Sequence, residues 1–148
     1  MNGYTNQYLT NTVHSASPEQ LMLMLYDGAI RFISLGIQAI ENGLIDKRGY
    51  YINKTSAIIS EFSATLDHSM NAQLADDLDA LYTYMLNRLM TANLKNDIEP
   101  LLEVKKLLSE LRSTWAKAIE VNKQEIRETT GGDSMSPVTS YKPIAVAM

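Results

Sequence analysis

The segment SPEQLMLMLYDGAIRFISLGIQAIENG, residues 17–43, decides the fold class. It opens with Ser17-Pro18-Glu19-Gln20, in which the serine can cap a helix, the proline suits the first helical position and the glutamine can close a capping box. Three rows of apolar residues follow at helical spacing until Asn42-Gly43, which predicts one long amphipathic helix. An apolar arc this wide must contact several helices or leave part of itself for a ligand chain.

Three further helices are predicted by the same spacing, because no glycine lies between Gly49 and Gly131 and the only proline there is Pro100. In the second helix we expect Asp46 to be the cap, with Ile45 and Tyr50 as a hydrophobic staple, and the pattern fades near His68.

The third helix is expected over about residues 72–93, with leucines at the spacing of an antiparallel bundle. The fourth begins at a cap formed by Asn96 or Asp97, tolerates Pro100 in its first turn and ends near Glu128. Its inner row runs through Leu101, Val104, Leu108, Leu111 and Trp115.

The fold class is therefore all-α, an antiparallel four-helix bundle with flanking segments of different character. Residues 1–16 are polar and loop-like but include Tyr8 and Leu9, so we interpret them as a movable N-terminal segment, or helix, that caps the bundle. Residues 17–128 form the helical bundle domain, and residues 129–148, rich in glycine, serine and proline, are predicted to be a disordered tail.

The composition excludes several classes of function. The chain has 148 residues, a formal net charge of −4 and no cysteine, and its 13 lysines and arginines are scattered, so we expect no nucleic-acid partner. The N-terminus lacks the features of a secretory signal, and the longest strongly apolar run is residues 21–26, too short for a membrane span. We therefore expect a cytosolic protein.

No catalytic or metal-binding motif is recognisable. Phosphate-binding loops, nucleophile elbows and the Glu-x-x-His pairs of di-metal bundles are all absent from the sequence. A phosphotransfer bundle would need an exposed histidine in mid-helix, whereas His68 falls near a helix end and His14 precedes the first helix. We expect no catalytic residue, no cofactor and no metal.

Other residues suit the binding of a partner protein, although each has an ordinary structural alternative. The eight methionines include Met85 and Met90, which adapt to irregular surfaces but also fill cores. Tyr84 and Arg88 lie four residues apart, away from the leucine row, and could form an interface or a simple surface pair. Asp27 and Arg31 are best explained as an ion pair within one helix.

Four ordered motifs give the chain a family resemblance that covers roughly residues 8–126. They are Ser15-Ala16-Ser17-Pro18 with the LMLMLYDG run after it, SATLD at 63–67, LYTYM at 81–85 with Arg88-Leu89, and Leu111-Arg112 with Trp115. In this order and spacing the sequence resembles the flagellar secretion chaperones that bind flagellin in the bacterial cytosol.

The resemblance implies an antiparallel bundle that holds the disordered C-terminal segment of flagellin, prevents its premature polymerisation and assists its delivery to the flagellar type III export apparatus. The partners would be flagellin and a component of that apparatus, with a weak homodimer as a further possibility. The N-terminal segment would cover part of the client site. The partner-binding residues expected on this basis are Tyr8, Leu9, Tyr26, Ile52, Ile59, Tyr82, Tyr84, Met85, Arg88 and Asn93. The alternative is a regulatory adaptor that binds another flagellar or transcriptional regulator.

Overall fold

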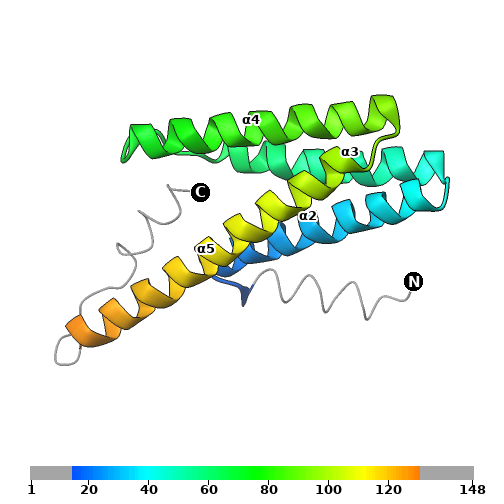
Figure 1. Ribbon diagram of the computed structural model, residues 1–148. Helices are drawn as coiled ribbons and strands as arrows, with labels where there is room; N and C mark the ends of the chain where they lie inside the picture. The colour runs from blue at the N-terminus through cyan, green and yellow to red at the C-terminus, as the bar shows by residue number, and fades with distance from the viewer. Residues whose placement is uncertain (1–14, 131–148) are drawn as a thin grey trace.

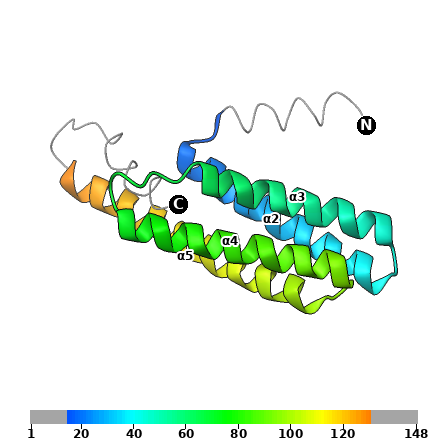
Figure 2. The ribbon, with the colours of Figure 1, turned by 90° about the horizontal axis from the view of Figure 1, so that it is seen from above.

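Four antiparallel helices make up the computed structural model, which describes residues 15–130. They are α2 (Pro18–Glu41), α3 (Ile45–Ala64), α4 (Ala72–Lys95) and α5 (Glu99–Thr129), and the described part of the chain contains no strand. Each helix packs mainly against two neighbours, so that α2, α3, α4 and α5 follow one another around the bundle (Figures 1 and 2). The all-α four-helix bundle is confirmed.

The helix α5 differs from the other three in length and direction. It has 31 residues against 20 to 24 in the others. It runs obliquely across α2, and its C-terminal end projects past the bundle (Figure 1). The predicted movable segment and disordered tail fall outside the described residues, apart from their residues nearest the bundle.

The start of α2 has the predicted capping box. The Ser17 hydroxyl accepts a hydrogen bond from the Gln20 amide at 3.3 Å, and the Gln20 side chain accepts one from the Ser17 amide at 3.0 Å. At the other end, Gly43 takes a left-handed conformation with φ of +68°, which turns the chain toward α3.

The predicted cap of the second helix is wrong. The N-cap of α3 is Leu44, which makes no side-chain capping bond, and Asp46 lies inside the first turn. The Leu44 amide donates to the Ala39 carbonyl at 2.8 Å, so the chain is held close to the end of α2 and α3 begins earlier than expected. Ile45 and Tyr50 are both largely exposed and do not form the expected staple.

The link between α4 and α5 agrees better with the sequence. Asn96 has φ of +50° and ends α4 in the left-handed region, while the Asp97 carboxylate accepts the Glu99 amide at 3.0 Å. Asp97 thus satisfies an amide at the start of α5, although the N-cap position itself is occupied by Ile98.

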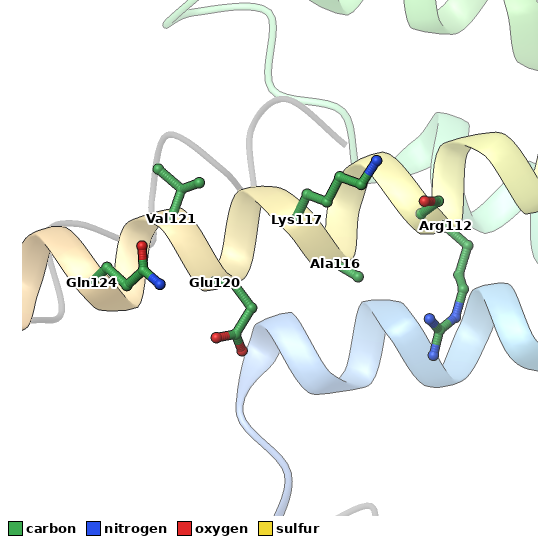
Figure 3. A pocket seen from close by; sticks show the side chains of 7 residues that line it. Arg112, Ala116, Lys117, Glu120, Val121 and Gln124 are labelled. Carbon is green, nitrogen blue, oxygen red and sulfur yellow. The ribbon is translucent and has the colours of Figure 1, made fainter.

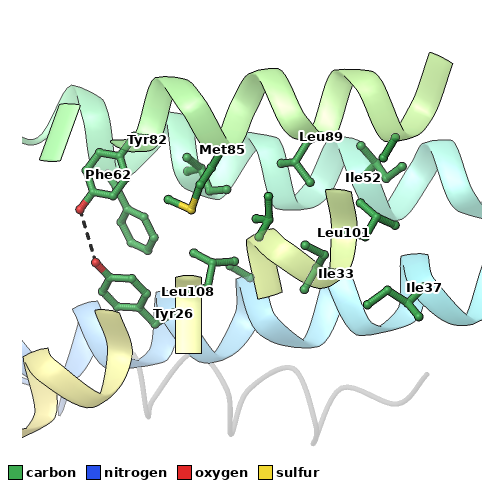
Figure 4. Packing of buried hydrophobic residues seen from close by; sticks show 14 of the residues in the cluster. Tyr26, Ile33, Ile37, Ile52, Phe62, Tyr82, Met85, Leu89, Leu101 and Leu108 are labelled. Carbon is green, nitrogen blue, oxygen red and sulfur yellow. Dashed lines mark hydrogen bonds between the residues drawn. The ribbon is translucent and has the colours of Figure 1, made fainter. Parts of the chain in front are cut away.

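The core is built from one row of residues on each helix (Figure 4). On α5 these are the predicted Leu101, Val104, Leu108 and Trp115. On α2 the fully buried residues form one of the three apolar rows, the row that contains Tyr26, Ala29 and Ile33, whereas Leu25 in a neighbouring row is 37% exposed. The wide apolar arc is therefore only partly used by the core.

One described helix, α2, is long and apolar enough to cross a membrane by length and composition. Core helices of bundles without a membrane have the same properties, and the Tyr26 row of α2 packs into the core between α3 and α5. The absence of a membrane span stays a prediction of the sequence.

We predict effects of very different size on stability for substitutions at two leucines of α4. Leu89 is 0% exposed and Leu94 is 80% exposed. Leu89→Ala should lower the free energy of unfolding by about 2–5 kcal/mol, because it removes transfer energy and leaves a cavity, while Leu94→Ala should change it by less than about 0.5 kcal/mol. Urea unfolding followed by circular dichroism would measure both, and equal losses would contradict this packing.

Candidate partner-binding surface

An aromatic cluster fills one end of the core. The Tyr26 and Tyr82 hydroxyls lie 3.4 Å apart within hydrogen-bond reach (Figure 4), and the Phe62 ring stacks on Tyr26 with centroids 4.4 Å apart. All three side chains are fully buried, and this burial raises the pKa of both tyrosines above its ordinary value. The cluster connects α2, α3 and α4 and leaves no open surface.

The structure divides the predicted partner-binding residues into three groups. Five lie in the core with exposed fractions of 2% or less, and all except Ile52, which borders a surface groove, could contact a partner only if the helices separated: Tyr26, Ile52, Ile59, Tyr82 and Met85. Three reach the surface: Tyr84, Arg88 and Asn93. Tyr8 and Leu9 lie outside the described residues. A partner-binding role for each of them stays a prediction.

Tyr84 and Arg88 meet on one carboxylate of the neighbouring helix. The Tyr84 hydroxyl donates to Glu103 Oε2 at 2.8 Å, and Arg88 Nε donates to Glu103 Oε1 at 2.7 Å. The hydrogen bond from Tyr84, followed by that from Arg88, holds the pKa of Glu103 below its ordinary value. These side chains therefore join α4 to α5 at the surface.

A groove between α3 and α4, here named the α3/α4 groove, is the best candidate for a peptide site. It has a volume of about 280 Å³. Its lining consists of Ile52, Asn53, Ser56, Leu86, Met90, Asn93 and Leu94. Two of these apolar side chains are strongly exposed, Met90 at 61% and Leu94 at 80%, although exposure to water is unfavourable for them. The lining has no charged side chain, which suits an apolar ligand segment.

Sequence reasoning identified only part of this groove. Ile52 and Asn93 were expected as partner-binding residues and Met90 as an adaptable one, but Leu86 and Leu94 were missed. The signal that could have found them is the four-residue spacing of Leu86, Met90 and Leu94, a second apolar row beside the inner row of α4.

Arg48 bridges the two helices at one end of the groove. Its Nε donates to Asn93 Oδ1 at 3.1 Å and its Nη1 donates to Asn96 Oδ1 at 2.6 Å. Arg48 lies one helical turn before Ile52 on α3, and Asn93 belongs to the groove lining itself. The guanidinium therefore lies beside Asn93 at one end of the α3/α4 groove.

The expected ion pair between Asp27 and Arg31 is wrong. Asp27 instead accepts a hydrogen bond from Arg112 Nε at 2.8 Å, so the ion pair joins α2 to α5. Farther along the same contact, the Trp115 indole donates to the Glu19 carbonyl at 3.3 Å. Trp115 is an anchor between these helices, in agreement with its place on the predicted inner row.

A second hollow, of about 530 Å³, lies along the C-terminal half of α5 (Figure 3). Its described lining comes from α5 alone and includes three charged residues, Arg112, Lys117 and Glu120. Because one helix and several charges offer an apolar ligand less contact than two helices with an uncharged lining, the α3/α4 groove is the stronger candidate.

Neither histidine position suggests catalysis. His68 has an acidic neighbour that the sequence did not reveal, with Nδ1 at 3.0 Å from Asp76 Oδ1, but both side chains are exposed and lie at the bundle surface. His14 lies outside the described residues. Within residues 15–130, no group of three or more histidines, aspartates or glutamates is placed to hold a metal ion.

The fold and surface together define a class of protein: a helical bundle that exposes an apolar groove between two helices, a type of surface suited to an amphipathic segment of another chain. Comparison with known proteins identifies the family within this class. Residues 1–122 match the model of the family described as flagellar protein FliS. The chain belongs to this family of flagellar secretion chaperones.

Individual relatives support the assignment over most of the chain. It is 39% identical over 131 residues to the flagellar secretion chaperone FliS of Bacillus subtilis, covering 88% of this chain and 96% of the relative. It is 36% identical over 113 residues to the FliS chaperone of Salmonella typhimurium, covering 76% and 84%. The corresponding protein of Campylobacter jejuni is 36% identical over 110 residues, covering 74% and 86%. The family resemblance predicted from the motifs is confirmed.

We predict that Glu103 gives the bundle an acid-sensitive contact. Its folded-state pKa lies below the unfolded-state value, so its contribution to stability is complete above the unfolded-state pKa and is lost as the pH falls through the folded-state pKa. Glu103→Gln should therefore lower stability at neutral pH and make the loss of stability shallower as the pH falls below the ordinary pKa of a glutamate.

Urea unfolding at several pH values measures this effect. The matched control is Glu110→Gln on the same helix, since the Glu110 carboxylate forms no ion pair within residues 15–130. If both variants had the same pH profile as the unmodified protein, Glu103 would have no special role.

Proposed function

We propose that this chain is a cytosolic export chaperone that binds the C-terminal segment of flagellin in the α3/α4 groove. The observation that carries the proposal is the exposed apolar lining of that groove, with Met90 and Leu94 both mostly exposed, in a chain of the FliS family. Covering these side chains with a client would remove apolar surface from water.

The mechanism follows from the physical nature of the client. A disordered amphipathic segment can fold as it binds, with its apolar residues entering the groove and its polar side left in water. The segment loses conformational entropy in the same step, and this loss offsets part of the free energy gained by burial, so the complex can be specific without being irreversible. While the segment is held, it cannot take part in the helix packing of the filament.

The binding reaction needs no covalent chemistry, cofactor or metal. Delivery of the client to the export apparatus requires only that a receptor contact another face of the complex, and release then depends on competition for the same segment. In this proposal Tyr8 and Leu9 act as the movable cover of part of the client site, and Asn93 lies in the lining of the groove. Tyr84 and Arg88 face α5, so any contact of theirs with the client would lie outside the groove.

The deciding experiment is a calorimetric titration with monomeric flagellin, full length and without its C-terminal segment. Full-length flagellin should bind one to one, and removal of the segment should abolish binding, because the segment supplies the apolar residues for the groove. If neither form binds, the chaperone proposal is wrong and the alternative of a regulatory adaptor should be tested. Sizing of the free protein in the same series would detect a homodimer.

A pair of methionines locates the client surface. Met90 is 61% exposed and lines the α3/α4 groove, whereas Met70 is 56% exposed in the loop between α3 and α4. Met90→Asp should weaken flagellin binding by about tenfold or more, because a carboxylate would have to be desolvated in an apolar contact. Met70→Asp should have little effect. Equal effects of the two substitutions would place the client elsewhere.

A further inference from the structure

The most unusual charge near the α3/α4 groove is that of Arg48. Both of its hydrogen-bond acceptors are uncharged amide oxygens, those of Asn93 and Asn96. None of the ion pairs within residues 15–130 includes it. By contrast, Arg88 and Arg112 each pair with a carboxylate of a neighbouring helix.

An arginine held in this way is prepared to bind an anion. A guanidinium has five N–H donors in a rigid plane, and the two bonds to asparagine use one hydrogen at Nε and one at Nη1, which leaves the other Nη1 hydrogen and both Nη2 hydrogens. The asparagines fix the orientation of the group without neutralising its charge. The remaining donors can therefore form the paired, charge-assisted hydrogen bonds that a carboxylate accepts.

The position of Arg48 indicates which carboxylate of a bound peptide it would contact. Its side chain reaches from α3 to α4 and lies beside Asn93 at the end of the groove where α3 begins and α4 ends. A peptide that lies along the groove and reaches this end would come close to the guanidinium. A chain that ends at this point places its terminal carboxylate on Arg48, whereas a chain that continues would have to pass over it.

We propose that Arg48 binds the α-carboxylate at the C-terminal end of the client, and so sets the direction and register in which the client lies in the α3/α4 groove. The occupant is a peptide with apolar residues before a free chain terminus. This inference rests on the proposed function, since it assigns one contact within the same client site. Asp46 and Lys47 precede Arg48 on α3, and Lys95 and Asp97 flank Asn96 at the end of α4. None of these four side chains is buried, so the guanidinium fixed by two asparagines is the distinctive feature.

The experiment uses the full chain and two synthetic peptides with the sequence of the C-terminal segment of flagellin, one ending in a free acid and one in an amide. The unmodified protein should bind the free acid about tenfold to a hundredfold more tightly than the amide, the range expected for a charge-assisted pair of hydrogen bonds. In Arg48→Gln the acid should bind as weakly as the amide does.

The matched control is Arg31→Gln, which removes the same charge from an exposed position on α2 and should leave the ratio of acid to amide affinity unchanged. Circular dichroism of each variant reports whether the helices remain folded. Because the comparison of acid and amide on the unmodified protein needs no substitution, equal binding of the two would overturn the inference even if Arg48→Gln unfolds.

Two results would overturn the inference while leaving the proposed function intact. Equal binding of the acid and the amide to the unmodified protein would show that the terminal carboxylate is not recognised. A preference for the acid that persists in a folded Arg48→Gln variant would show that another group recognises it. Failure of both peptides and of full-length flagellin to bind would instead remove the proposed function itself.

Discussion

The burial of the Tyr26 row of α2 is the constraint on which the rest of the structure depends. Once Tyr26 packs on Phe62 and places its hydroxyl beside that of Tyr82, the rotation of α2 and α4 about their own axes is fixed, since each buried hydroxyl needs a hydrogen-bond partner. With Tyr82, Met85 and Leu89 turned inward, the neighbouring row of α4 must face the rim of the groove. The apolar surface left for a partner is thus a consequence of the core.

Polar contacts between neighbouring helices then hold this arrangement at the surface. Glu103 joins α5 to α4, Asp27 joins α2 to α5, and Arg48 joins α3 to α4. Exposed pairs of this kind each contribute little to stability. Their value lies in geometry, because each pair is made only when two antiparallel helices have one particular axial alignment. The axial alignment of α3 and α4 therefore determines the shape of the groove between them.

The sequence predicted the fold well because its signals were local. Ser17 and Gln20 define a cap within four residues, and the inner row of α5 stands out because its other faces are polar. On α2 the apolar arc is so wide that periodicity could not choose between the rows of Leu25 and Tyr26. The partner of Asp27 was missed for a different reason, since Arg112 is distant in the chain and no spacing rule connects them.

The candidate site was harder to predict, because a binding surface breaks the rule that identifies a core. The row of Leu86, Met90 and Leu94 has helical spacing but remains partly or largely exposed to water. This exposure is unfavourable, and packing of the core alone does not explain it. The polar residues of its lining carry amide and hydroxyl groups, and these uncharged groups do not fix the position of an apolar segment along the groove. In the proposed complex, shape and burial supply the attraction, and the oriented charge of Arg48 at one end of the groove defines where the client ends.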